Sequence, residues 1–130
     1  MKVLIVDGYN AMHKIPEIDA VSDDSLEEAR GAVTSMAREY QRRVGGVSEV
    51  FVVFDGKDEY RGMSFDKPNQ VFSRTGQGDK KVIQLAHDKV DKFHVVVASD
   101  DNYVGNSCRA AGATVITISE FYSTASKRRR

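Results

Sequence analysis

The sequence predicts one α/β domain, a three-layer α/β/α sandwich with a mostly parallel central sheet. Short apolar runs recur along the chain, and each has the composition of a strand buried on both faces. Segments with helical periodicity separate these runs, and such alternation is typical of parallel strands joined by helical crossovers. At 130 residues, the chain has the length of one domain with a core of its own.

The first strand is predicted at residues 2–6, a branched and apolar run that follows Lys2 without a further polar break. Asp7 comes directly after it, and Gly8 marks the turn by which the chain leaves the sheet. Residues 11–24 have no clear hydrophobic period, so we expect a loop there with at most a short turn of helix.

The first long helix is predicted to begin after Ser25. Ser25 and Glu28, three residues apart, form a capping-box pattern that marks a helix start. Apolar residues then recur at helical spacing over residues 26–44, and the glycine pair at 45–46 ends the helix.

The second strand is predicted at residues 50–54 and repeats the shape of the first. An apolar run again ends in Asp and Gly, here Asp55 and Gly56. The polar residues 57–69 indicate an irregular loop, and residues 70–73 indicate a short edge strand.

A second helix and a third strand follow. Residues 74–78 predict a flexible, partly basic loop that leads into Asp79. We expect Asp79 at the amino end of a helix whose apolar face extends over residues 82–90. The third buried strand is predicted at residues 93–98.

The remaining part of the chain predicts two helices and a fourth strand. We expect Asp100 to cap a helix through residues 103–111, which Gly112 closes. The fourth strand is predicted at residues 113–118, and a last short helix at residues 119–122.

The composition indicates the cellular compartment that we expect for the protein. The single cysteine, Cys108, excludes an internal disulfide and a cysteine-based zinc cluster, in keeping with a reducing compartment. The chain shows no signal-peptide pattern and no run near the ~20 apolar residues of a membrane span. We therefore expect a cytoplasmic protein without a membrane partner.

The net charge of zero hides an asymmetry between a domain at residues 1–123 and a basic tail at residues 124–130. The last four residues are all basic, and the rest of the chain has 15 basic against 19 acidic side chains. The tail either approaches a polyanion or simply keeps the chain end solvated.

Acids follow the predicted strands. Asp7, Asp55 and Asp100 lie where three parallel strands would end at one edge of the sheet, and Asp79 begins a helix on that side. Such carboxylates repel one another unless a cation neutralises them. Mg²⁺ and Mn²⁺ prefer carboxylate, carbonyl and water oxygens, and a bound cation of this kind activates water for phosphodiester hydrolysis.

Several of these residues have structural alternatives. Asp55 before Gly56 is also typical of a turn, and Asp101 is expected to be solvated. Tyr9 either stacks on a base or packs against the domain. Four basic residues near the same edge either contact backbone phosphates or are ordinary solvated charges: Arg61, Arg74, Lys80 and Lys81.

Other chemistries lack their sequence patterns. No Ser-His-Asp or Cys-His arrangement is indicated, and the three histidines lack ligand spacing. The Gly-Gln-Gly at residues 76–78 is not followed by the Gly-Lys-Ser/Thr of a P-loop. The Asp-Gly-Tyr-Asn at residues 7–10 is likewise not a dinucleotide-binding pattern.

Four segments carry a resemblance: residues 6–10 (Val-Asp-Gly-Tyr-Asn), residues 53–56 (Val-Phe-Asp-Gly), Asp79 opening a helix, and residues 99–102 (Ser-Asp-x-Asn). In this order they resemble the NYN domain family of PIN-like, metal-dependent ribonucleases. The chain looks most similar to the YacP-like group of small bacterial proteins, over roughly residues 2–123.

The resemblance implies that three acids bind Mg²⁺ or Mn²⁺, namely Asp7, Asp79 and Asp100. Asn102 stands at a further metal position, where many members of the family have Asp. The residues that would shape the site are Asn10, Asp55 and Asp101, and the last lies beside Asn102, where it can replace the missing charge. The activity implied is endoribonuclease cleavage of single-stranded RNA, with messenger RNA on translating ribosomes as the suggested substrate.

Two alternatives remain beside this hypothesis. The first is a non-catalytic RNA- or ribosome-binding module on the same fold, which the Asn at position 102 favours. The second is a phosphoacceptor signalling domain, which would need a second acid beside Asp7 and a basic residue late in the sheet. The chain instead has Gly8 after Asp7, and Ser119 after the last strand.

Overall fold

The computed structural model describes residues 1–56 and 69–126, and a five-stranded sheet forms its centre. The strands are β1 (Lys2–Asp7), β2 (Val47–Phe54), β3 (Gln70–Phe72), β4 (His94–Ala98) and β5 (Thr114–Ile116). Their order is β3-β2-β1-β4-β5, and all neighbouring strands are parallel. The predicted parallel sheet, with a short edge strand, is confirmed. The predicted loop after β2 lies outside the described residues, apart from its last residue.

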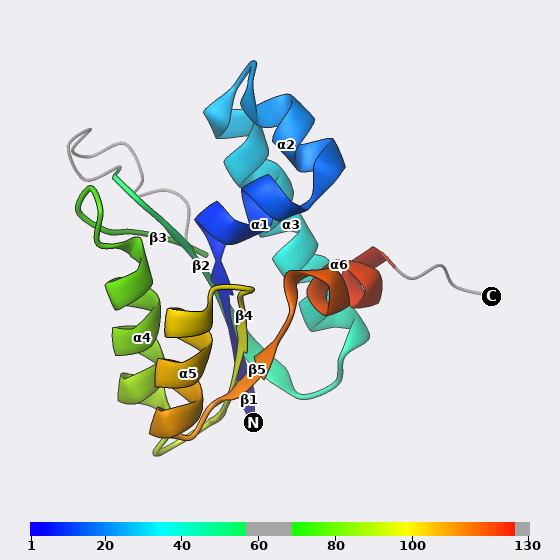
Figure 1. The fold of residues 1–130 in the computed structure, drawn as a ribbon. Helices are drawn as coiled ribbons and strands as arrows, with labels where there is room; N and C mark the ends of the chain where they lie inside the picture. The colour runs from blue at the N-terminus through cyan, green and yellow to red at the C-terminus, as the bar shows by residue number, and fades with distance from the viewer. Residues whose placement is uncertain (57–68, 127–130) are drawn as a thin grey trace.

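Helices cover both faces of the sheet, as the three-layer prediction requires (Figure 1). The helices are α1 (Gly8–Lys14), α2 (Pro16–Ser22), α3 (Leu26–Arg43), α4 (Gly78–Lys89), α5 (Asn102–Ala111) and α6 (Ile118–Ser126). Leu4 and Val6 of β1 belong to a buried cluster with side chains of α3 and α6. Val3 and Ile5 belong to a second cluster with α4 and α5. The central strand is therefore buried on both faces.

The strand order reverses at the centre of the sheet. The chain adds β2 and β3 on one side of β1, and then β4 and β5 on its other side. In open α/β sheets, ligands bind outside the carboxyl ends of the strands at such a reversal. Asp7 ends β1 at this point, and Ser99 follows β4.

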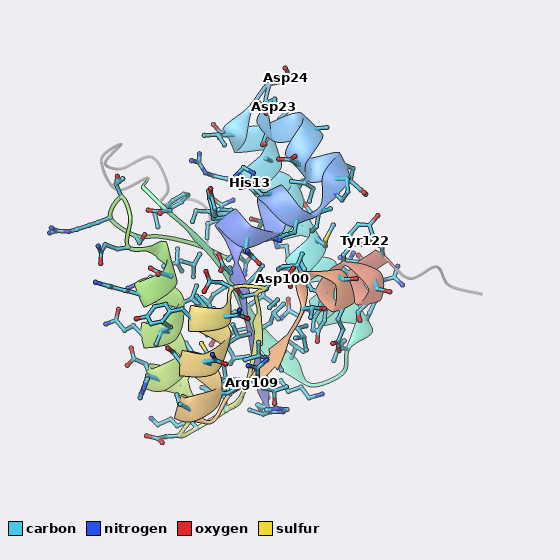
Figure 2. The ribbon with its side chains drawn as sticks, viewed as in Figure 1. His13, Asp23, Asp24, Asp100, Arg109 and Tyr122 are labelled. Carbon is cyan, nitrogen blue, oxygen red and sulfur yellow. The ribbon has the colours of Figure 1, made fainter. Side chains whose placement is uncertain are left out.

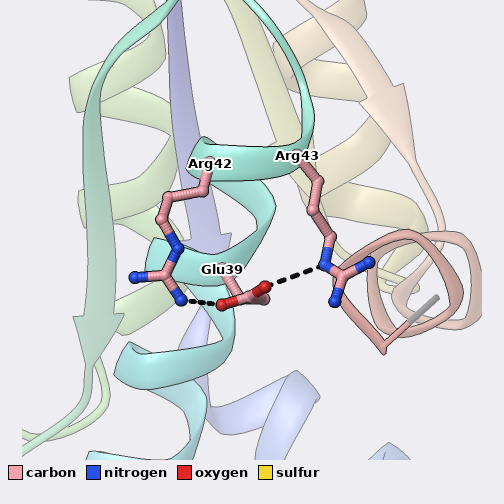
Figure 3. A network of polar contacts seen from close by, with 3 residues as sticks. All are labelled: Glu39, Arg42 and Arg43. Carbon is pink, nitrogen blue, oxygen red and sulfur yellow. Dashed lines mark hydrogen bonds and ion pairs between the residues drawn. The ribbon is translucent and has the colours of Figure 1, made fainter. Parts of the chain in front are cut away.

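The ends of α3 follow from local interactions. The Ser25 hydroxyl accepts a hydrogen bond from the backbone N–H of Glu28 at 3.1 Å, as the capping pattern predicts. At the other end, Glu39 forms ion pairs with Arg42 and Arg43 (Figure 3). Pairs of this type stabilise a helix by only about 0.2–0.5 kcal/mol each, so burial of the apolar face of α3 is the larger contribution.

The prediction of a loop over residues 11–24 was wrong, because α1 and α2 occupy most of that segment. Asp7 is the N-cap of α1, where its carboxylate accepts a hydrogen bond from the backbone N–H of Asn10 at 3.3 Å. Pro16 opens α2, at a helix position that favours proline. Each helix has seven residues and buries only one to three of them, which is too few to produce a hydrophobic period.

The prediction that Asp100 caps α5 was also wrong. Asp101 is the N-cap, and its carboxylate accepts a hydrogen bond from the backbone N–H of Val104 at 3.0 Å. The carboxylate of Asp100 accepts instead from the backbone N–H of Ile118, at 2.8 Å, where α6 begins. Gly112 closes α5 in the left-handed conformation, at φ 109°, as predicted.

The last helix, α6, continues to Ser126, three residues into the segment that the sequence assigned to the tail. Residues 127–130 lie outside the described part of the chain. Within the described ranges, no helix is both long enough and apolar enough to cross a membrane.

Gly8 allows α1 to approach the second strand. A Cβ at this position would lie 2.5 Å from the backbone oxygen of Val53 and 2.6 Å from the ring of Phe54. Gly8→Ala is therefore expected to lower the free energy of unfolding by about 1–3 kcal/mol, as overpacking does. Gly31→Ala is the matched control, because open space surrounds that helical position, and it should stabilise by about 0.5–1 kcal/mol. Urea unfolding compares the two, and an equal effect would contradict the role of Gly8.

Candidate active site

A cavity of about 270 Å³ opens at the carboxyl ends of the central strands. Four acids from different parts of the chain line it. Asp7 ends β1, Asp55 follows β2, Asp79 lies in the first turn of α4, and Asp101 caps α5. The other side chains and backbone around the cavity come from Tyr9, Asn10, Val53, Gly76 and Gly78. Acids distant in sequence therefore meet where the fold predicts a ligand site.

Asp7 is the most constrained of these acids. One carboxylate oxygen accepts a hydrogen bond from the backbone N–H of Asn10, and the other accepts from the hydroxyl of Ser99 at 2.8 Å. Burial raises the pKa of Asp7 above its usual range, and the two hydrogen bonds lower it only in part. The charges of Asp101 and Asp79 raise the pKa of Asp7 further. An ionised Asp7 therefore gains from any nearby cation.

Ser99 joins two of the acids. The residue is 4% exposed. Its side-chain oxygen accepts a hydrogen bond from the backbone N–H of Asp101 at 3.1 Å, while its hydroxyl donates to Asp7. It thus fixes the end of β4 against the end of β1. Sequence reasoning assigned Ser99 no role, although a small hydroxyl residue directly after the apolar run at residues 95–98 was a usable signal.

Removal of the Ser99 hydroxyl should disturb the positions of Asp7 and Asp101. Ser99→Ala leaves the partly buried Asp7 carboxylate without this donor, which is expected to cost about 1–3 kcal/mol of unfolding free energy. If the cavity is catalytic, activity should fall about 10–100-fold, because residues that orient a site have effects of this size. Ser99→Thr retains the hydroxyl and is the matched comparison. Activity of Ser99→Ala equal to that of the wild type would contradict a positioning role.

Asp55 and Asp79 are the two acids that line the cavity from the side of β2 and α4. The carboxylate of Asp55 accepts a hydrogen bond from the backbone N–H of Gly76 at 2.7 Å, which ties the end of β2 to the loop before α4. Gly78 packs close by, since a Cβ there would lie 3.3 Å from the Cβ of Asp55. Asp79 accepts from the backbone N–H of Lys80 at 2.8 Å. The sequence offered a turn as the alternative role of Asp55, and in the structure this residue also lines the acid cavity.

Asp100 and Asn102 do not line this cavity. Asp100 lies beside the start of α6 (Figure 2), and its backbone N–H donates to the side-chain oxygen of Asn10 at 2.6 Å. Asn102 is exposed in the first turn of α5. The hydrogen bond between Asp100 and Asn10 connects α1 to the segment after β4, and the site-shaping role of Asn10 stays a prediction.

The predicted RNA-binding residues occupy varied positions. Tyr9 lines the cavity and is 61% exposed, so its ring is available to a ligand. Arg74 and Lys80 are exposed and Lys81 is half-buried, all beside the start of α4, but none of the three lines the cavity. Arg61 lies outside the described residues.

The chain is similar to known proteins in both sequence and structure. The model of the YacP-like NYN domain matches residues 4–130. The uncharacterized protein YacP of Bacillus subtilis is 40% identical over 55 residues, which are 42% of this chain and 31% of that protein. The chain thus matches less than a third of the length of this curated relative.

Two crystal structures of Rae1 (YacP) from Bacillus subtilis, one of them a mutant, share the fold. Their TM-scores are 0.77 and 0.75, at 26% and 25% sequence identity. The superpositions cover 96% of this chain, and 75% and 74% of the two crystallised chains. The family predicted from four short segments is confirmed, and the chain belongs to the YacP-like NYN domain family of PIN-like nucleases.

Proposed function

We propose that the protein is a Mg²⁺- or Mn²⁺-dependent endoribonuclease that hydrolyses phosphodiester bonds of single-stranded RNA. The observation that carries this proposal is the cavity around which Asp7, Asp55, Asp79 and Asp101 meet. Membership in a PIN-like nuclease family agrees with it. The nucleic-acid class is RNA, in line with that family.

The donor set suits a hydrated divalent cation. In residues 1–56 and 69–126, no three His, Cys, Asp or Glu side chains are grouped closely enough to hold a metal ion by themselves. Mg²⁺ usually keeps several waters and binds to one or two carboxylates, so a closed protein cage is not required. A cavity of about 270 Å³ leaves room for such waters, each of which takes about 30 Å³ in the liquid.

We assign a hydrated cation to the part of the cavity lined by Asp7, Asp79 and Asp101, with one or two of these carboxylates as direct ligands and the rest contacted through its waters. Asp101 replaces Asp100 in this set, because only Asp101 lines the cavity and raises the pKa of Asp7 by its charge. When bound, the cation would polarise a phosphoryl oxygen and lower the pKa of a coordinated water. Asp7 would remain ionised and fixed by Ser99, while Asn10 keeps the strand ends together.

The basic residues beside α4 support a polyanionic substrate. Arg74, Lys80 and Lys81 lie beside the start of α4 and would contact backbone phosphates that flank the bond to be cut. Messenger RNA on a translating ribosome is the substrate that the family resemblance suggests, and it belongs to the same proposal.

Cleavage of a labelled single-stranded RNA of mixed sequence tests the proposal. We expect cuts with Mn²⁺ and with Mg²⁺, and none after chelation with EDTA. DNA of the same sequence serves as the substrate control. If no metal supports cleavage of free RNA or of RNA on translating ribosomes, the enzymatic proposal is wrong.

A non-catalytic RNA- or ribosome-binding module is the second candidate. It is favoured by the lack, in the described residues, of a ready-made group of three metal-binding side chains. This candidate predicts RNA binding without metal-dependent cuts, so the same assay with a binding measurement separates the two.

A further inference from the structure

A second cavity, of about 350 Å³, lies next to the acid cavity and shares Tyr9 and Asp55 with it. Its other walls come from α1, the start of α3 and the end of β2, including Met12, His13, Leu26, Arg30 and Phe54. The volume falls in the range of about 300–1,000 Å³ that is typical of small-ligand sites. A ligand in this second cavity would lie beside the proposed reaction centre, because Tyr9 and Asp55 line both cavities.

Aromatic and apolar side chains form part of the lining of this second cavity. Tyr9 is 61% exposed, and its ring contacts the ring of His13 edge-on, with centroids 4.5 Å apart. Leu26 is 50% exposed although it is a large apolar residue. Figure 2 shows His13 on the helix that follows β1. Flat, exposed rings beside an apolar rim are the features on which unpaired bases stack.

Arg30 adds polar recognition inside the cavity. Its guanidinium lies over the rings of Phe54 and Phe72, at 5.9 and 5.7 Å from their centroids. Its Nε is buried and has no hydrogen-bond partner among the described residues. A guanidinium offers donors only, whereas Asp55 on the shared wall offers carboxylate acceptors. This donor and acceptor pair suits the edge of a nucleobase.

We propose that the second cavity binds one unpaired base of the RNA whose phosphodiester lies at the acid cavity. The proposal rests on the proposed nuclease function and adds a base subsite to it. Because Tyr9 lines both cavities, the bound base and the phosphate would be neighbours along one strand. A base held in a duplex stack cannot enter, so this subsite gives a physical reason for preference for single strands.

Binding of two RNAs tests the subsite without relying on cleavage. The probes are a short fluorescein-labelled single-stranded RNA of mixed sequence and a matched abasic RNA with the same backbone. Both are titrated by fluorescence anisotropy in EDTA. One stacked base changes affinity by about tenfold, so the wild type should bind the intact RNA about ten times more tightly than the abasic one.

Two tyrosine variants test whether Tyr9 causes the preference for intact RNA over abasic RNA. Tyr9→Leu should reduce the preference for intact RNA to nearly one, and Tyr103→Leu should leave it unchanged. Tyr103 is the matched control, since it is 56% exposed but lines neither cavity. Both substitutions are at the surface, and thermal melting confirms that each variant is folded.

The outcomes separate the subsite from the nuclease. Equal affinity for the two RNAs, or no measurable binding of either, overturns the base subsite, as do equal effects of the two tyrosine variants. Cleavage of the intact RNA with Mn²⁺ is measured in parallel. Cleavage without a base preference supports the nuclease and rejects the subsite. A Tyr9-dependent preference without cleavage, either of the free RNA or of RNA on translating ribosomes, supports the subsite and rejects the nuclease.

Discussion

Asp7→Asn is expected to abolish metal-dependent RNA cleavage and, at the same time, to stabilise the metal-free protein at neutral pH. The loss of activity follows from removing the charge that the cavity offers to a cation. The shape is retained, because Asn is isosteric with Asp and is an equally good N-cap for α1. Residues that only orient the ligands of a metal site change activity by up to about 100-fold. Because the charge of Asp7 would act on the cation itself, we expect the rate of cleavage to fall by at least that factor.

The gain in stability follows from the raised pKa of Asp7. Burial raises this pKa above the ordinary value of 3.8, so between the two values the folded protein binds more protons than the unfolded chain. The contribution of Asp7 to the stability of the wild type therefore falls as the pH rises from the ordinary value of 3.8 through the folded-state pKa. The Asn variant lacks this loss and should be more stable above that window, by about 1 kcal/mol, as is common for single stabilising substitutions.

Urea unfolding in EDTA across this pH range measures the effect, and cleavage assays with Mn²⁺ measure the activity. Asp88→Asn is the matched control, because Asp88 is exposed in α4 and lines neither cavity. It should change stability by less than about 0.5 kcal/mol and leave cleavage intact. Full activity of Asp7→Asn would exclude the acid cavity as the reaction centre.

Asp101→Asn and Asp100→Asn are expected to differ sharply, although the two residues are adjacent. Asp101 lines the cavity and caps α5, and Asn retains the cap, so the variant should fold normally and lose about 100-fold or more of its activity. Asp100 accepts a hydrogen bond from the start of α6, and an Asn oxygen can accept the same bond. We therefore expect Asp100→Asn to retain activity within a few-fold.

Initial cleavage rates and melting temperatures of the two variants check this difference. Melting temperatures near that of the wild type for both variants would assign any loss of activity to the chemistry. The reverse pattern, with Asp100→Asn inactive and Asp101→Asn active, would restore the ligand set that the sequence resemblance implied.

The sequence predicted where the strands and the long helices lie, because those features depend on local rules. Two strand bounds differ by more than one residue: β2 begins three residues before the predicted start, and β5 ends two residues before the predicted end. Ser25 caps α3 through the contact that its spacing to Glu28 implies, and Gly112 closes α5 with a positive φ. The apolar run after Lys2 is buried on both faces, as an unbroken run predicts. Asp7 and Asp79 also lie at the predicted strand end and helix start.

Local rules could not predict that Asp101, and not Asp100, lines the acid cavity. Which of the two lines it depends on how the chain turns after β4, and that turn is fixed by Ser99, which contacts Asp7 from 92 positions away. The two short helices before α3 likewise form because Ala11, Met12 and Ile18 are buried by elements distant in sequence. Tertiary contacts of this type leave no period in the sequence.

A Mn²⁺ titration that records metal binding and RNA cleavage in the same samples tests the acid cavity most directly. Calorimetry of the wild type should show Mn²⁺ binding that Asp101→Asn weakens and Asp100→Asn does not. The cleavage rate should rise in proportion to the occupancy of that site and vanish in EDTA. Cleavage that persists in EDTA, or Mn²⁺ binding and cleavage that Asp101→Asn leaves unchanged, would contradict a metal-dependent reaction centre in this cavity.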